Sequence, residues 1–268
     1  MSPPGAGRAA GPLSAQVIVF AKAPVAGQAK TRLIPALGAA GAAALAERLL
    51  DHAVAQAVAA GLGRVVLCVT PSTAHPAFQR LRAHYSLHLT LQGQGDLGRR
   101  MHRALAQALA GAPACTPTRA PTLTPTRAPT IAPTIAPIGA TPLAPPGNAG
   151  VLLIGSDAPA LSAAVLRAAA AALADADAVV VPALDGGYVL IGLRRPAPTL
   201  FEGVAWSTGQ VMAQTRQRAA AAGLRLVALP ALADIDEPTD LQHLQHLPLP
   251  LPLCQPLPHT PPAGHGLA

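Results

Sequence analysis

Short runs of apolar residues recur along the chain, and most of them end at a glycine or a polar turn. Residues 151–154 are all apolar and two of them are β-branched, which predicts a strand buried on both faces. Similar runs predict further strands at residues 16–21, 64–70, 87–91, 178–182, 189–193 and 224–229.

Longer segments, several of them rich in alanine, lie between many of these runs. They predict helices at residues 37–60, 75–84, 99–110, 162–174 and 209–222. Helices that alternate with buried strands indicate an α/β fold. The length of 268 residues allows one large domain of this class or two small ones.

Three segments lack such patterns. In residues 112–149 the sequence Thr-Arg-Ala-Pro-Thr occurs twice, and proline this dense prevents helix and sheet, which predicts a Pro/Thr-rich low-complexity insertion into one domain. Residues 1–15 and the Pro/Leu-rich residues 248–268 are predicted to be disordered tails. A single folded domain is therefore expected over residues 16–247.

The composition argues against a membrane protein and against a disulfide-rich or zinc-binding one. The alanine-rich run 38–61 contains Glu47, Arg48, Asp51 and His52, which would be costly in hydrocarbon. The three cysteines have no metal-type spacing and are odd in number, so they indicate neither a zinc site nor a disulfide framework. We expect a cytoplasmic protein without a membrane partner.

The net charge of +7 is unevenly distributed. Residues 15–111 carry ten basic and three acidic side chains, whereas residues 150–268 carry six basic and nine acidic ones. Nucleic-acid-binding proteins usually add stacking aromatic residues or a recognisable motif, and neither is visible here. We therefore expect no nucleic-acid partner, but a domain with phosphate-binding cations on one side and metal-binding carboxylates on the other.

Asp157 follows the predicted strand 151–154. Ligands of open α/β sheets bind outside the carboxyl ends of strands, where a carboxylate is suited to hold a cation that carries phosphates. The alternative is that Asp157 caps the helix that follows. Residues 234–240 bring a second group of carboxylates, denser than capping explains.

The loop after the first strand, residues 22–33, carries Lys22, Lys30 and Arg32 and is flexible at Gly27. It is not a Walker loop, because Gly27 lies three residues before Lys30. It is nevertheless suited to hold a diphosphate or triphosphate. A solvated basic loop is the alternative.

Two glycine-containing turns add further candidates. The turn 92–98 opens a helix that begins with Arg99 and Arg100, cations that the helix dipole disfavours there, so an anionic ligand or a solvated face explains them equally well. In the other turn, Gly186 and Gly187 allow close approach of the backbone to a ligand.

Asp185 and Tyr188 of that second turn could contact sugar or base hydroxyls, although a plain hairpin turn is the alternative. Trp206, the only tryptophan, lies in a Trp-Ser-Thr sequence before the next helix and completes the candidate substrate-binding set.

Six ordered motifs resemble those of one family. They are Lys-Ala-Pro-Val-x-Gly-x-x-Lys-Thr-Arg-Leu (22–33), Gly-Asp-Leu-Gly-x-Arg-Met (95–101), Gly-Ser-Asp-x-Pro (155–159), Asp-Gly-Gly-Tyr-x-Leu-Ile-Gly (185–192), Trp-Ser-Thr (206–208) and Asp-x-Asp-x-Pro-x-Asp (234–240). In this order they resemble the small GT-A-fold transferases called selenodomain-associated transferase 1 or arsenosugar-biosynthesis glycosyltransferase. The chain is more distantly similar to 2-phospholactate guanylyltransferase and to molybdenum-cofactor and sugar-acid nucleotidyltransferases.

The resemblance implies a single Rossmann-like GT-A domain, the nucleotide-diphospho-sugar transferase fold, with a mixed, mostly parallel sheet flanked by helices. It implies that Lys22, Gly27, Lys30, Arg32 and Arg99 bind the nucleotide. It also implies that Asp157 and Asp236 bind Mg²⁺ or Mn²⁺, with Asp157 and Lys30 as the catalytic candidates. The Asp-x-Asp of many glycosyltransferases is absent, since Gly155 takes its first position.

Three functions follow from the resemblance. The first is a glycosyltransferase that moves a sugar from a nucleotide-sugar to a small-molecule acceptor, with a nucleoside diphosphate as leaving group. The alternative is a nucleotidyltransferase that uses an NTP and releases pyrophosphate, and the third is a non-catalytic nucleotide-binding module. In each case we expect Asp157 and Asp236 to meet at one cation, because without it the two carboxylates would repel each other.

Overall fold

A computed structural model describes residues 14–111 and 150–244 of the chain. The predicted insertion 112–149, the tail 248–268 and residues 1–13 of the other predicted tail lie outside the described residues. Ala15, which the sequence analysis assigned to that tail, is buried, and its N–H donates to the carbonyl oxygen of Leu62. The folded part therefore starts slightly before the first strand.

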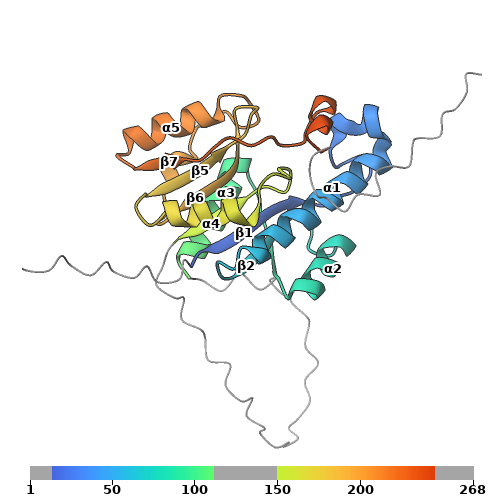
Figure 1. The fold of residues 1–268 in the computed structure, drawn as a ribbon, viewed down its shortest axis with the longest axis horizontal. Helices are drawn as coiled ribbons and strands as arrows, with labels where there is room; N and C mark the ends of the chain where they lie inside the picture. Colours follow the sequence, from blue (N-terminus) through green and yellow to red (C-terminus); the bar gives the residue numbers. More distant parts are fainter. Residues whose placement is uncertain (1–13, 112–149, 245–268) are drawn as a thin grey trace, which may run out of the picture.

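Within the described residues, seven strands form one sheet in the order β3-β2-β1-β4-β6-β5-β7 (Figure 1). Their bounds are β1 Gln16–Lys22, β2 Val65–Thr70, β3 His88–Leu91, β4 Val151–Ile154, β5 Ala178–Pro182, β6 Tyr188–Leu193 and β7 Leu226–Ala228. All neighbours pair in parallel except β6, which is antiparallel to β4 and β5. The short connection from β5 to β6 requires this, because a parallel pair needs a long crossover. The mixed, mostly parallel sheet is thus confirmed.

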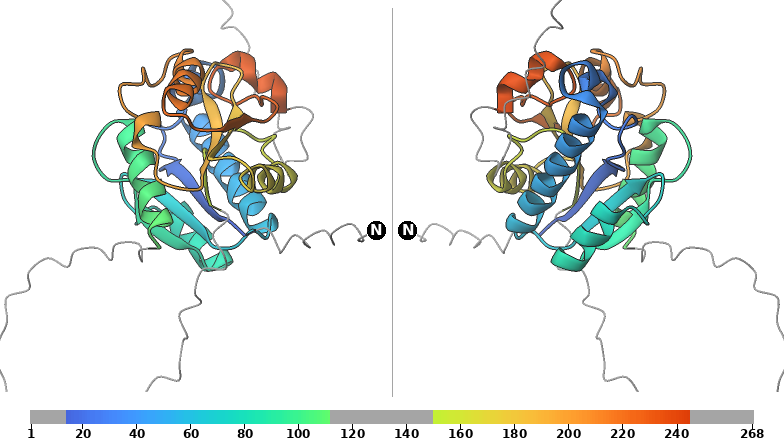
Figure 2. Two further views of the ribbon diagram at one scale, coloured as in Figure 1. Left: turned by 90° about the vertical axis from the view of Figure 1, so that its left-hand side faces the viewer. Right: turned by 90° about the vertical axis from the view of Figure 1, so that its right-hand side faces the viewer.

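In the part of the chain that the structure describes, five α-helices cover the sheet: α1 Ile34–Ala59, α2 Pro76–Tyr85, α3 Leu97–Leu109, α4 Ala163–Ala172 and α5 Val211–Ala221. Alternate residues of the strands point to opposite faces. Val17 and Val19 of β1 belong to the core that includes α1, α2 and α4, whereas Ile18 belongs to the core that includes α3 and α5. The sheet is therefore a middle layer with helices on both faces (Figure 2).

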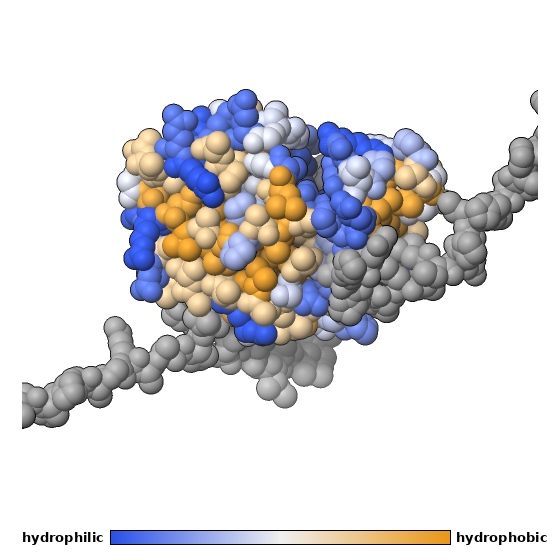
Figure 3. Space-filling view, turned by 45° about the horizontal axis from the view of Figure 1, so that its top comes forward, coloured by the Kyte–Doolittle hydropathy of each residue, from blue (hydrophilic) through white to orange (hydrophobic). Residues whose placement is uncertain are grey.

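A third apolar cluster joins α1 to the last described residues. Leu33, directly before α1, and Leu45 and Leu49, within it, pack with Ile235 and with Leu244 of the 3₁₀-helix η3. This helix, Pro238–Leu244, lies beside the start of α1 in Figures 1 and 2. In Figure 3 hydrophilic residues gather over this part of the surface, beside a hollow. The cluster brings the acidic segment 234–240 to the basic loop 22–33.

Among the described residues one helix, Thr31–Ala59, is long and apolar enough to cross a membrane by length and composition. In the structure it packs on β1 and β2 and against α2 and α4. Its Glu47 and Asp51 form ion pairs of 2.8 and 2.9 Å with Arg80 of α2. These are the contacts of a helix that covers a sheet.

Candidate functional site

A cavity of about 520 Å³ lies where β1, β2 and β4 end. Its volume falls in the range of small-molecule and cofactor sites. Its wall contains six of the predicted site residues, namely Lys22, Lys30, Arg32, Asp157, Tyr188 and Asp236. Tyr188 reaches this edge because β6 is antiparallel and begins where β4 ends.

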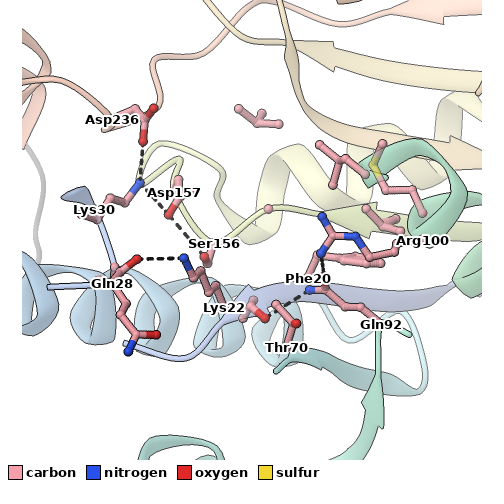
Figure 4. Close-up of a pocket in the computed structure, with 18 of the residues that line it drawn as sticks. Phe20, Lys22, Gln28, Lys30, Thr70, Gln92, Arg100, Ser156, Asp157 and Asp236 are labelled. Atoms are coloured by element: carbon pink, nitrogen blue, oxygen red, sulfur yellow. Dashed lines mark hydrogen bonds and ion pairs between the residues drawn. The ribbon is translucent and has the colours of Figure 1, made fainter. Parts of the chain in front are cut away.

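Lys30 connects the two predicted metal-binding carboxylates (Figure 4). Its Nζ lies 2.8 Å from Oδ1 of Asp157 and 3.6 Å from Oδ1 of Asp236, and it donates to the carbonyl oxygen of Ile235. The Lys30 side chain is only 6% exposed, whereas each carboxylate is about half exposed, at 48% and 47%. The structure thus brings both carboxylates to one cation, but that cation is a lysine ammonium.

The backbone fixes this arrangement. The N–H of Ile235 donates to the carbonyl oxygen of Asp157 over 2.9 Å, and the Ile235 side chain is fully buried. Lys30 itself has a left-handed backbone conformation, with φ 48° and ψ 45°, immediately before the 3₁₀-turn Thr31–Leu33. Such a conformation is uncommon for a residue other than glycine, so the surrounding contacts hold it in place.

Asp157 does not cap the helix that follows it. Ser162 is the N-cap residue of α4, and its hydroxyl accepts from the N–H of Val165. The Asp157 side chain instead accepts from Lys30 and, over 3.3 Å, from the hydroxyl of Ser156. The capping alternative is therefore wrong, and Asp157 faces the cavity.

In the acidic segment it is Asp240 that has the capping role. Its Oδ2 accepts from the N–H groups of Asp236 and Glu237 over 3.0 and 2.7 Å. Asp236 is thereby left to pair with Lys30 and with Arg32, whose Nη1 lies 3.0 Å from Oδ2. Arg32 is 61% exposed and also lies 3.5 Å from Glu237. The predicted phosphate-binding cation Arg32 thus lies at the mouth of the site, paired with carboxylates.

Asp234 is a charged group of the site that the sequence analysis did not select. Burial raises its pKa to about 6, and the nearby charges of Asp185 and Asp157 add to the effect. The motif 234–240 contained it, but only the fold shows that it is half-buried beside other carboxylates. Asp185 itself lies outside the cavity wall, and its Oδ1 accepts from the N–H of Gly187 over 2.8 Å.

At the other end of the cavity the structure places Arg100, not Arg99, in the wall. Arg99 is 79% exposed and lies 3.7 Å from Asp96, the N-cap residue of α3. Nη1 of Arg100 donates to Oε1 of the buried Gln92 over 2.8 Å. Successive helix residues point about 100° apart, so only one of the two arginines can face the cavity.

Gln92 holds this end of the cavity together. Its Nε2 donates to the carbonyl oxygens of Ala21 and Cys68, over 3.1 and 3.2 Å. The sequence analysis missed Gln92 and chose Arg99 over Arg100. The signal that could have found Gln92 is a polar residue directly after the predicted strand 87–91, where a side chain reaches the same sheet edge as Asp157.

The remaining predicted substrate residues support the cavity from outside. The indole of Trp206 packs on Gly98, where an added Cβ would lie 2.4 Å from Nε1, and it meets Tyr188 edge-on at 6.3 Å. The hydroxyl of Tyr188 is buried without a hydrogen-bond partner among the described residues, and burial raises its pKa. Gly186 approaches the carbonyl oxygen of Gly209 closely, so its small size serves the packing of this turn.

The loop residues Gly27 and Lys22 differ in position. Gly27 adopts φ 77° in the turn of the loop and lies outside the cavity wall. Lys22 lines the cavity and its Nζ donates to the carbonyl oxygen of Gln28 over 2.8 Å. Of the predicted cations, Lys22, Lys30 and Arg32 therefore come together, whereas Arg99 does not.

The carboxylate groups of the cavity fit a divalent cation only in part. No group of three or more His, Cys, Asp or Glu side chains that could hold a metal ion occurs within residues 14–111 and 150–244. Mg²⁺, however, is usually bound through one or two carboxylates together with substrate phosphates. Because Asp157 and Asp236 already share one cation, the pair fits a divalent ion that also binds a nucleotide, provided that the Lys30 ammonium moves away.

Comparisons with known proteins agree with this fold. The model of a family described as "Uncharacterized protein conserved in bacteria (DUF2064)" matches residues 53–126 and 136–208. None of the curated proteins matches the chain. The crystal structure of a candidate nucleotide-diphospho-sugar transferase from Desulfovibrio desulfuricans G20 is similar, with 26% identity, a TM-score of 0.67, and coverage of 87% of this chain and 86% of that one.

Two further structures are more distantly similar to the chain. One is 4-diphosphocytidyl-2C-methyl-D-erythritol synthase from Anaerococcus prevotii, with 8% identity, a TM-score of 0.48, and coverage of 86% of this chain and 96% of the other. The second is glucosyl-3-phosphoglycerate synthase from Mycobacterium tuberculosis in complex with Mn²⁺, UDP and its product, with 9% identity, a TM-score of 0.45, and coverage of 86% and 75%.

Proposed function

Because the chain belongs to the DUF2064 family and has the nucleotide-diphospho-sugar transferase fold, we propose that it transfers a glycosyl group from a nucleotide-sugar to a small-molecule acceptor. Within that family the motifs of the sequence favour the selenodomain-associated or arsenosugar-biosynthesis type. The structure similar at 26% identity supports this proposal through its description as a candidate nucleotide-diphospho-sugar transferase.

The main support for the proposal is the arrangement of charged and polar side chains along a single cavity. Lys22, Lys30 and Arg32 lie at one side of the cavity next to Asp157 and Asp236, and Arg100 with Gln92 forms the far end. A nucleoside diphosphate needs cations at its phosphates and a neutral or hydrogen-bonding surface at its base. The cavity offers cations at one side and the hydrogen-bonding side chains of Gln92 and Arg100 at the other.

In the proposed reaction the acceptor oxygen attacks the anomeric carbon of the donor sugar, and the bond from that carbon to the diphosphate breaks. The electron pair leaves with the nucleoside diphosphate, so negative charge grows on the phosphates. Lys22 and Arg32 stabilise this charge electrostatically from fixed positions in the loop. A divalent cation bound by Asp157 and Asp236 would supply further positive charge on the diphosphate. Met101 and the partly buried Tyr188 add an apolar wall beside the donor.

A nucleotidyltransferase is the second candidate, in which an acidic or phosphorylated small molecule attacks the α-phosphate of an NTP and pyrophosphate leaves. The third candidate is a non-catalytic nucleotide-binding protein, which would bind either ligand without turnover. Gly155 favours this third candidate, because the glycine stands where many glycosyltransferases have the first aspartate of Asp-x-Asp.

A thermal-shift panel distinguishes these functions. The full chain is heated with NTPs and with nucleoside-diphosphate sugars, each with and without Mn²⁺, and nucleotide release is then measured with a mixed set of acceptors. We expect the nucleoside-diphosphate sugars with Mn²⁺ to raise Tm most. A response to NTPs alone would identify a nucleotidyltransferase, and binding without any turnover would favour the third function.

A further inference from the structure

The Lys30 ammonium is already engaged by protein oxygens. Its Nζ donates to the carbonyl oxygen of Ile235 and forms ion pairs with Asp157 and Asp236, at 2.8 and 3.6 Å. The side chain is 6% exposed. In this state Lys30 therefore neutralises the two carboxylates and is not free to bind the phosphates of a nucleotide.

The second lysine of the loop is different. Lys22 is directed to the backbone oxygen of Gln28 and has no carboxylate partner within the described residues. The two lysines thus share a loop, a charge and a cavity wall, but only Lys30 lies between the aspartates. Lys22 provides a natural comparison for any effect of Lys30.

The ammonium and a divalent cation exclude each other. A metal ion bound at about 2.0–2.1 Å would have to take the same carboxylate oxygens that Lys30 now contacts. Two positive charges a few ångströms apart repel strongly in a partly buried site. Without either cation, Asp157 would lose its ion-pair partner and Asp236 would keep only Arg32, at 3.0 Å. The site therefore holds one cation at a time between Asp157 and Asp236.

We infer that Lys30 is a built-in counter-cation that competes with the divalent ion for Asp157 and Asp236. The metal then binds tightly only together with a nucleotide, whose phosphates give the displaced ammonium a new acceptor. Metal and nucleotide affinities are coupled as a result, each raising the other by the same factor. The nucleotide part of this inference rests on the proposed function, whereas the competition between Lys30 and the metal does not.

The competition is tested with Mn²⁺ alone, on the full chain without nucleotide. Free Mn²⁺ is measured by electron paramagnetic resonance during titration of the parent, Lys30→Met and Lys22→Met, after circular dichroism has confirmed that each is folded. We expect Lys30→Met to bind Mn²⁺ about tenfold more tightly than the parent, a typical size for such coupling. Lys22→Met removes the same charge from the same loop and should bind Mn²⁺ like the parent.

A second titration uses only the parent protein, in case Lys30→Met does not fold. Its affinity for Mn²⁺ is measured with and without UDP, with UDP alone as the blank, and should be about tenfold higher with UDP. Equal Mn²⁺ affinity of the parent and Lys30→Met would overturn the inference, as would equal affinity of the parent with and without UDP when UDP binds. If neither UDP nor any of ADP, GDP and CDP binds but Lys30→Met still gains Mn²⁺ affinity, the proposed function fails and the counter-cation stands.

Discussion

The Asp157 carboxylate forms an ion pair with the buried ammonium group of Lys30. If only the repulsion between Asp157 and Asp236 acted, removing the charge of Asp157 would stabilise the free protein. The structure gives the opposite sign, because the Lys30 ammonium lies between the two groups and attracts both. At the scale of single residues, the charge of Lys30 therefore decides whether removing the Asp157 carboxylate stabilises or destabilises the protein.

Replacing Asp157 by Asn should therefore lower the free energy of unfolding. We expect a loss of about 1–3 kcal/mol, the size of a hydrogen bond to a charged group, because Lys30 keeps only Asp236 and the Ile235 carbonyl as partners. Urea unfolding of the two proteins measures it. Glu237→Gln is the control, since its ion pair with Arg32 is exposed and contributes ~0–1 kcal/mol. A variant as stable as the parent would show that Asp157 is not needed to hold Lys30.

The turn between β5 and β6 illustrates how elements are positioned. Its Gly186 has φ 91°, and the carbonyl oxygen of this glycine accepts from the N–H of Met212 in α5 over 2.8 Å. An added Cβ would lie 2.2 Å from the carbonyl oxygen of Gly209. The hairpin and the start of α5 are therefore packed backbone to backbone, and this contact helps to set where Tyr188 enters the cavity wall.

Gly186→Ala should be much more destabilising than Gly27→Ala. Both glycines have positive φ, but nothing lies within 4 Å of the Cβ position of Gly27. We expect Gly27→Ala to lower stability by about 1 kcal/mol through backbone strain alone. Gly186→Ala adds a backbone clash and should lower it by about 3 kcal/mol or more. Thermal unfolding followed by circular dichroism compares them, and equal losses would mean that the turn moves freely away from Gly209.

At the scale of the whole molecule, the sheet is held together without the insertion. β4 pairs with β1 from Gln16 to Val19 on one side and with β6 on the other, so its place in the sheet is fixed by strands that are described. The predicted insertion 112–149 lies between α3 and β4 in the sequence and outside the described residues. We expect its length to affect the free energy of folding mainly through the entropy of loop closure, which costs about 0.6 kcal/mol for each doubling of loop length.

Replacing residues 112–148 by a short Gly/Ser linker should leave a folded protein that binds the same nucleotides. We expect the melting temperature to stay within a few degrees of the parent, because each doubling of loop length changes closure by only about 0.6 kcal/mol. Solubility, circular dichroism and the thermal-shift panel check it. The control deletion extends through Ile154 and removes β4, which should prevent folding. Loss of soluble protein after the shorter replacement would mean that the insertion packs on the domain.

The sequence alone determined the elements and the class of fold. The predicted strand 151–154 coincides with β4, and the predicted helix 75–84 differs from α2 by one residue at each end. Apolar runs and helical periodicity are local properties, so the residues that form an element also carry its signal. The same holds for the position of Asp157 directly after a strand, which was sufficient to place it at the sheet edge.

The tertiary structure alone decided which charges meet. Lys30 pairs with Asp157 and with Asp236 because Ile235 is buried against α1 and hydrogen-bonded to the end of β4. The local sequence pattern does not distinguish Lys30 from Lys22. Nevertheless, Lys30 is a buried counter-cation, whereas Lys22 is an exposed residue of the cavity wall. Likewise the rotation of α3, not its composition, selects Arg100 over Arg99 for the cavity. Contacts between residues far apart in the chain have no local pattern, because they exist only once the sheet has brought its strand ends together.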